Sequence, residues 1–318
     1  ERFFDTVDDI RTFAIDELGL ETGDNYRRYL RYDRDHLVDV VSAARETSFE
    51  RKTWWFPVVG SVPYKGYYRP SRAEATARRL DRRGWDVVVR PVDAFSTLGY
   101  FDDPLYGFML TYDTPRLAEL IIHESAHATV WIDGEGRFNE EFATFVGRAG
   151  AREYVIRRGE RNAEARASEK RPPATSASDV VASLDARRHD REVFRRDVLE
   201  LRRRLEALYD RELPREDTLR RKSEIIAAAQ REFADTYEER YVGDGYRYFA
   251  EITINNAWID LFHTYEGDLP LFERFHREVG GGDLRRTIAA IIEATTADGG
   301  HDGDPHDDLR RYCEDTRQ

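Results

Sequence analysis

The sequence predicts a protein of the α+β class, with a small mixed sheet, a pair of adjacent helices and a mainly helical C-terminal half. Two observations support this prediction. Short β-branched runs, typical of buried strands, occur at residues 37–44 and 86–92 in the first third of the chain. After residue 114, apolar residues recur at helical spacing. The 318 residues, 40% of them hydrophobic and 12% aromatic, are enough for a sizeable core.

The first third of the chain alternates helices and strands. Residues 3–19 carry apolar side chains at helical spacing and predict an amphipathic helix. Residues 54–62 are expected to form a partner strand for the first β-branched run. Ser71 is expected to cap a helix that ends at Gly84. Residues 96–99 follow as an extended piece whose edge could hold a peptide backbone; an ordinary core strand is an equal alternative.

An H-E-x-x-H motif, His123-Glu124-Ser125-Ala126-His127, lies near the middle of the chain. On a helix, residues four positions apart share one face, so both imidazoles can reach the same metal ion. Glu124 stands beside them and can direct its carboxylate at a water on that ion. Thr114 followed by Pro115 predicts the start of this helix, with Thr114 as the N-cap. The motif alone also occurs by chance in charged helices, so a third ligand is needed.

Glu140 is the natural third ligand, since a zinc site of the protease kind has three protein ligands and one open position. Twelve residues separate Glu140 from His127. The Asp133-Gly134-Glu135-Gly136 turn ends the first helix and lets a second helix, expected at 137–158, fold back. The sequence therefore predicts a site formed by His123, His127 and Glu140.

The second half is expected to be helical. The predicted divisions are a core with both metal motifs at 1–158, a polar linker followed by an antiparallel helical hairpin at 159–243, C-terminal helices completing the catalytic domain at 244–296, and an acidic flexible tail at 297–318. The hairpin helices are expected to pack on each other; a lid or a partner-binding role is the alternative. Within the tail, His301 and His306 stand among aspartates, where loose metal binding is the alternative to simple flexibility.

Charge and cysteine content exclude several classes. The net charge of −12 and the pI near 5.3 argue against nucleic acid, which requires a basic surface. Cys313 is the single cysteine, so no intrachain disulfide forms. No run reaches the roughly 18 apolar residues of a membrane span. Because the chain starts at Glu1, we expect a processed or truncated form, which leaves open a removed signal or anchor.

The motifs resemble those of known peptidases. H-E-x-x-H followed by Asn-Glu-x-x-Ala, at Asn139–Ala143, resembles the gluzincins, in which the second motif supplies the third zinc ligand. More closely, the chain is similar to a bacterial zinc aminopeptidase family through the stretches IRTFAIDELGL, NYRRY, WFPVVGSVPYKGYY, RPVDAFSTLGYFDDPL, LIIHESAHATVW, FNEEFATFVGRAGA and INNAWIDLFHTY. These stretches cover most of 8–155 and 246–293. Leu is common in the family where Ser125 stands, and Gly or Ser where Glu141 stands.

The resemblance implies a gluzincin-like fold, Zn²⁺ as the cofactor, a peptide substrate and aminopeptidase activity. It also suggests the bacterial cell envelope as the location. Glu124 would then act as the general base. In related gluzincins a Tyr or His after the third ligand stabilises the oxyanion. Tyr265 is the leading candidate, with Tyr246, Tyr248 and His263 as rivals.

An aminopeptidase also needs a carboxylate near the metal for the ammonium group of the substrate. Glu141, Asp102 and Asp103 are the candidates, and the sequence does not choose among them. Two other functions remain open at this level. One is a zinc endopeptidase with an open cleft. The other is a non-catalytic scaffold that retains a metal site and binds a protein partner through its helical hairpin.

Overall fold

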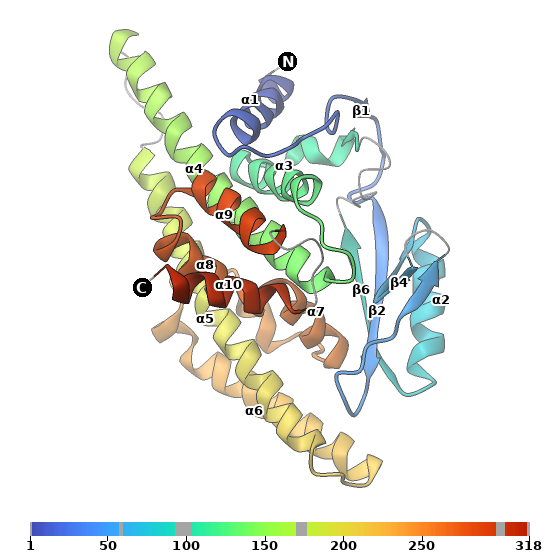
Figure 1. Ribbon diagram of the computed structural model, residues 1–318. Coiled ribbons are helices and arrows are strands. Elements are labelled where there is room, and N and C mark those ends of the chain that lie inside the picture. Colours follow the sequence, from blue (N-terminus) through green and yellow to red (C-terminus); the bar gives the residue numbers. More distant parts are fainter. Residues whose placement is uncertain (1, 57–59, 93–102, 170–176, 297–302, 317–318) are drawn as a thin grey trace. The chain divides into compact units, whose positions relative to one another are not determined.

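The computed structural model describes residues 2–56, 60–92, 103–169, 177–296 and 303–316 and confirms the α+β class (Figure 1). The chain divides into two compact units, each built from separate segments. The first unit contains Glu1–Asp35, Ser96–Ala182 and Asp268–Gln318, and the second contains His36–Phe95 and Ser183–Gly267. The predicted strands and the helices that carry the two metal motifs are assigned to different units, because contacts between segments distant in the sequence define each unit.

The first unit is mainly helical. Its elements are α1 (Arg2–Asp16), β1 (Tyr29–Leu30), β7 (Leu105–Tyr106), the 3₁₀ helix η1 (Gly107–Thr111), α3 (Thr114–Thr129), α4 (Gly136–Glu169), α8 (Leu269–Glu278), α9 (Leu284–Thr296) and α10 (Pro305–Asp315). β1 and β7 pair in parallel, with Tyr29 opposite Leu105. This short pairing holds the chain around residue 26 beside residue 103, about ten residues before the start of α3.

The termini of α3 and α4 are set by two side chains. Asp113, not Thr114 as predicted, is the N-cap of α3, and its carboxylate accepts from the Arg116 N–H at 2.9 Å. Pro115 lies in the first turn, where its missing N–H costs nothing. In the turn between the helices, the Asn139 side chain bonds both the N–H and the C=O of Ile132, at 3.0 and 2.8 Å. This clamp holds α4 where it folds back along α3.

The expected flexible tail is wrong for residues 305–315, which form α10. Asp304 caps the helix through the His306 N–H at 2.9 Å, and Pro305 occupies the first turn. Leu309 and Cys313, one turn apart, are 0% and 2% exposed. Acidic composition suggested mobility, but a cap, a first-turn proline and an apolar stripe are sufficient for a docked helix.

The second unit contains the sheet and the hairpin. Its elements are β2 (Val38–Arg45), β3 (Trp54–Phe56), β4 (Gly60–Val62), β5 (Tyr64–Tyr67), α2 (Pro70–Asp81), β6 (Trp85–Val92), most of α5 (Ala177–Tyr209), α6 (Arg215–Arg240), the 3₁₀ helix η2 (Arg247–Ala250) and α7 (Asn256–Glu266). The antiparallel sheet has the order β5-β2-β6, and β3 and β4 form a separate two-stranded ribbon.

Three local predictions need correction. The partners of β2 are β5 and β6 rather than the stretch at 54–62. The N-cap of α2 is Arg69, not Ser71, because Pro70 takes the first helical position. In the first unit, α4 runs to Glu169, into the expected linker, since that polar stretch lacks a helix breaker before Pro172.

The predicted antiparallel hairpin is confirmed. Arg240 pairs with Asp197, and Arg204 pairs with Glu232 at 3.1 Å, so the two helices run in opposite directions. The apolar faces of α5 and α6 meet η2 and α7 in one core, whose fully buried members include Val198, Leu205 and Ile259. Packing against neighbouring elements therefore accounts for the apolar stripe of the hairpin.

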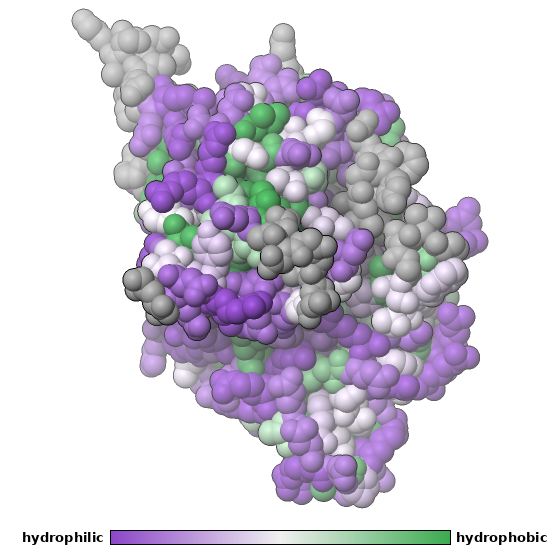
Figure 2. All heavy atoms as spheres, in the orientation of Figure 1, coloured by the Kyte–Doolittle hydropathy of each residue, from purple (hydrophilic) through white to green (hydrophobic). Residues whose placement is uncertain are grey.

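The described surface is strongly polar. The face drawn in Figure 2 is predominantly hydrophilic, with smaller apolar areas between charged side chains. Among the described residues, none of the helices combines the length and the apolar character that crossing a bilayer requires.

Candidate metal centre

Three side chains of the first unit converge as the sequence predicts. Nε2 of His123 and Nε2 of His127 each lie 3.8 Å from Oε2 of Glu140. The three atoms all lie within 4.8 Å of one another and form a group that could hold a metal ion. The two imidazole rings come from successive turns of α3, and their planes are nearly perpendicular at 85°. The arrangement gives two nitrogens and one carboxylate oxygen facing a common point.

A glycine in α4 permits this approach. A Cβ at Gly147 would lie 2.9 Å from the backbone oxygen of Glu119 and 3.0 Å from Cβ of His123. Gly147 is seven residues after Glu140, two helical turns on, so both face α3. Gly150 makes a similar approach to Ile122. The small residues on one face of α4 therefore bring its backbone against α3 and carry Glu140 to the histidines.

The site environment favours a neutral His123. Burial, helped by the neighbouring His127 and only partly opposed by Glu140, lowers the pKa of His123 to about 3. For His127, burial lowers the pKa, but the nearby Glu140 carboxylate outweighs it and raises the pKa. A bound cation would compete with the proton for the His127 nitrogen.

Glu124 lies on the same helix with a pKa close to neutrality. Burial, with smaller contributions from Glu140 and Asp103 and against the effect of His127, raises its pKa to about 7. A carboxylate with a pKa near the working pH can both accept and return a proton. The residue that the sequence assigns as the base therefore has suitable acidity.

A second acidic group, Glu141, Asp268 and His306, also has ligand atoms within 4.8 Å of one another. Glu141 accepts from Arg137 Nε at 3.1 Å, the Asp268 N–H at 2.8 Å and His306 Nε2 at 2.7 Å. Arg137 also donates to Asp268 at 2.8 Å, so guanidinium and imidazole groups already balance these carboxylates. We therefore interpret this group as a buried ion-pair network, which leaves the His123 group as the candidate metal centre.

This ion-pair network rules out Glu141 as the carboxylate that binds the ammonium group of a substrate. Glu141 is 0% exposed and both its oxygens are bonded within the protein, so no carboxylate oxygen is available to a substrate. Asp102 lies outside the described residues. Asp103 remains, and its charge raises the pKa of Glu124, which places it on the Glu124 side of the site.

The predicted oxyanion donors all lie in the second unit. The Tyr265 hydroxyl accepts from Arg90 Nη2 at 2.7 Å, and the guanidinium lies 5.2 Å from the centre of the ring. Tyr246 stacks on Phe194 with centroids 4.3 Å apart and packs, partly buried, against the core of that unit, whereas Tyr248 is 45% exposed. The role of Tyr265 in catalysis stays a prediction. The candidate substrate strand at 96–99 lies outside the described residues.

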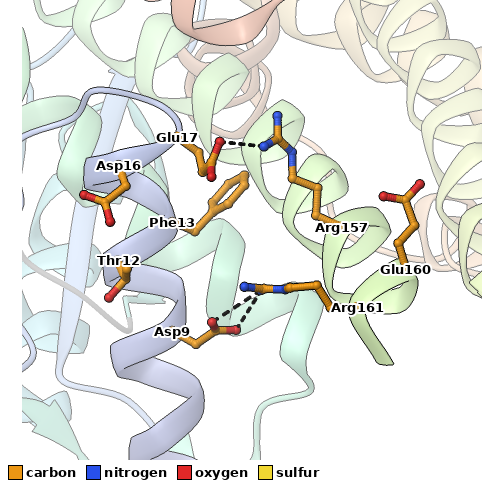
Figure 3. A pocket seen from close by; sticks show the side chains of 8 residues that line it. All are labelled: Asp9, Thr12, Phe13, Asp16, Glu17, Arg157, Glu160 and Arg161. Atoms are coloured by element: carbon orange, nitrogen blue, oxygen red, sulfur yellow. Dashed lines mark hydrogen bonds and ion pairs between the residues drawn. The ribbon is translucent and has the colours of Figure 1, made fainter. Parts of the chain in front are cut away.

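A pocket of about 310 Å³ lies elsewhere in the first unit, between α1 and α4 (Figure 3). Its charged groups largely satisfy one another: Arg157 binds Glu17 at 2.5 Å, and Arg161 binds both oxygens of Asp9 at 3.3 Å. Phe13 is the apolar part of its lining (Figure 3). None of the candidate metal ligands lines this pocket. We therefore assign it no role in the reaction at the candidate metal centre.

Two residues near the site were missed from the sequence. Gly147 occurs in the stretch FVGRAGA, where nothing distinguishes a packing glycine from any other. Tyr26 occurs in NYRRY, among similar tyrosines, yet it is 2% exposed and takes a left-handed backbone conformation with φ of 63°. Its position depends on contacts with residue 103, so no local pattern could reveal it.

Comparison with known proteins gives one match. A family model described as "Putative aminopeptidase" matches residues 2–299, which is nearly the whole chain and includes both metal motifs. No curated protein and no solved structure matches.

Proposed function

We propose that this chain, which belongs to the putative aminopeptidase family, is a zinc-dependent aminopeptidase of the gluzincin type. Family membership supports a peptidase in general. The observation that supports the finer proposal is the convergence of His123, His127 and Glu140, with Glu124 on the same helix as the two histidines.

The three ligand atoms fit a zinc ion in number, type and spacing. Two histidines and one glutamate are a common catalytic set, which leaves a fourth position open. Bonds of about 2.0–2.1 Å in a tetrahedron separate ligand atoms by roughly 3.3 Å. The observed separations from Glu140 Oε2 are 3.8 Å, so a small inward movement of the side chains completes the site.

The chemistry then divides between the ion and the protein. Bound zinc supplies Lewis-acid activation of a water molecule and polarises the peptide carbonyl. Glu124 accepts the proton of that water as it attacks, and returns it to the leaving amine. Its pKa of about 7 in the buried site suits both steps.

Asp103 is our candidate for binding the free amino group of the substrate. Of the three carboxylates considered, it is the described one whose charge acts on Glu124. Its backbone is held by bonds to residues 25 and 26. A carboxylate in this position would favour substrates with a free N-terminus and would support exopeptidase activity.

The test combines metal analysis with paired substrates. Wild-type protein, Glu124→Gln and the matched control Glu160→Gln, an exposed carboxylate of α4, are assayed on aminoacyl 4-nitroanilides and on their N-acetylated forms. We expect one zinc per chain in all three proteins. We also expect hydrolysis of the free-amine substrates by wild type and Glu160→Gln, and a loss of about 10³-fold or more in Glu124→Gln.

Two results would contradict the proposal. Zinc binding without hydrolysis of either substrate class would favour a non-catalytic scaffold. Equal cleavage of the acetylated and the free-amine substrates would favour an endopeptidase and remove the proposed role of Asp103.

A further inference from the structure

Tyr26 holds a backbone conformation that bulky residues rarely adopt. Its φ of 63° lies in the left-handed region, which is an outlier for an aromatic residue. Neighbouring bonds impose it. The Tyr26 N–H donates to the Asp103 carbonyl oxygen over 2.6 Å, and the Asn25 side chain accepts from the Asp103 N–H at 2.8 Å. Strain of this kind persists only where the surrounding structure holds it, and it clusters at functional sites.

The Tyr26 hydroxyl is buried. The residue is 2% exposed, and among the described residues its hydroxyl has no hydrogen-bond partner. Buried hydroxyls are nearly always bonded, because burial removes the bonds they make with water. Within the described part of the chain, Tyr26 thus combines a strained backbone with a donor that lacks an acceptor, and a ligand that accepts its bond accounts for both features.

Two carboxylates of the same unit act on the Tyr26 hydroxyl. Burial is the main cause that raises its pKa well above the usual value, and the charges of Glu124 and Asp103 act in the same direction. The hydroxyl thus keeps its proton and remains a donor. The backbone bond from the Tyr26 N–H to the Asp103 carbonyl oxygen holds the two residues together, and the charge of Asp103 also acts on Glu124.

We propose that the Tyr26 hydroxyl donates a hydrogen bond to the carbonyl oxygen of the peptide bond that is cleaved. This inference rests on the proposed aminopeptidase function. In a substrate with a free N-terminus, one α-carbon separates the ammonium group from the carbonyl under attack. A donor beside both Asp103 and Glu124 is therefore within reach of that oxygen. The bond strengthens as the oxygen gains negative charge, which lowers the barrier.

The test compares Tyr26→Phe with the matched control Tyr29→Phe, which removes an exposed hydroxyl from the same segment. Zinc content, melting temperature and kcat/KM on a free-amine aminoacyl 4-nitroanilide are measured for both. We expect kcat/KM of Tyr26→Phe to fall about 10²-fold, with zinc content unchanged. The melting temperature should stay equal or rise, because the variant removes an unsatisfied buried group. Loss of a tyrosine with a purely structural role would not lower kcat/KM while zinc content and melting temperature are maintained.

A second readout separates this inference from the proposed function. Affinity of the zinc-loaded proteins for leucine hydroxamate, whose carbonyl oxygen is a hydrogen-bond acceptor, is measured by calorimetry. We expect about 10-fold weaker binding by Tyr26→Phe than by wild type and Tyr29→Phe. Loss of hydroxamate affinity with no hydrolysis by wild type would overturn the peptidase function and keep Tyr26 as a ligand donor. Equal affinity together with kcat/KM within twofold of wild type would overturn the role of Tyr26, as would a wild type that does not bind the hydroxamate.

Discussion

Replacement of Gly147 by alanine tests whether the spacing of α3 and α4 sets the metal centre. The new Cβ would lie 2.9 Å from the backbone oxygen of Glu119 and 3.0 Å from Cβ of His123, whereas ordinary contacts begin near 3.4 Å. Both neighbours belong to the body of α3 and cannot rotate away. The two helices must therefore separate by about 0.5 Å at this point to restore ordinary contact distances.

The separation should reach the metal ligands. Glu140 faces α3 two turns before Gly147 on the same rigid helix, and a ligand set tolerates displacements of only about 0.5 Å. Overpacking costs about 1–3 kcal/mol, and alanine returns about 1 kcal/mol of helix propensity. The expected net loss of stability is about 0–2 kcal/mol, with zinc affinity weaker by about 10-fold.

The assay measures zinc dissociation constants by competition with a fluorescent chelator, and unfolding of the metal-free protein by urea. Gly136→Ala is the matched control, because it lies in the same helix and a Cβ there meets nothing within 4 Å. The control should bind zinc as wild type does. If folded Gly147→Ala also binds zinc with wild-type affinity, the proposed dependence of the site on helix spacing is wrong.

Three further predictions concern single side chains. His306→Leu should destabilise the protein by about 3 kcal/mol, because it leaves the buried Glu141 carboxylate without one donor. Burial lowers the pKa of His306, but its bonds to carboxylates outweigh this and raise it. The stabilisation should therefore be full below about pH 6.5 and fade as the pH rises through the higher folded pKa, and a gap between wild type and variant that widens with pH in urea titrations would contradict it. On the acid side, kcat/KM should decrease with an apparent pKa at or below about 7, since Glu124 acts only when deprotonated and its buried pKa is about 7. A pH–rate profile that is flat from pH 5 to 8 would remove Glu124 as the base. Tyr265→Phe tests the predicted role of this hydroxyl at the oxyanion: kcat should fall about 10²-fold with little change in KM, and unchanged steady-state kinetics would contradict that role and fit a structural hydroxyl, which accepts from Arg90.

The ligand set was predictable because it depends on local geometry. Helical periodicity alone places His123 and His127 on one face. The glycine-containing turn at residues 133–136 ends the first helix and brings Glu140 back toward them. Helical spacing of apolar residues likewise predicted the hairpin, because the apolar stripe of each helix determines the face on which it packs. Local patterns failed at the cap residues, where Asp113 and Arg69 each stand one or two positions from the expected residue.

The sequence by itself therefore determined the α+β class, the convergence of His123, His127 and Glu140, the place of Glu124 beside them and the helical hairpin. Only the tertiary structure decided that β2 pairs with β5 and β6, that α10 docks and encloses Glu141, and that Tyr26 meets Asp103. The physical reason is separation along the chain. Periodicity and capping act within a few residues, whereas these contacts join residues 22 to 165 positions apart and depend on how whole elements pack.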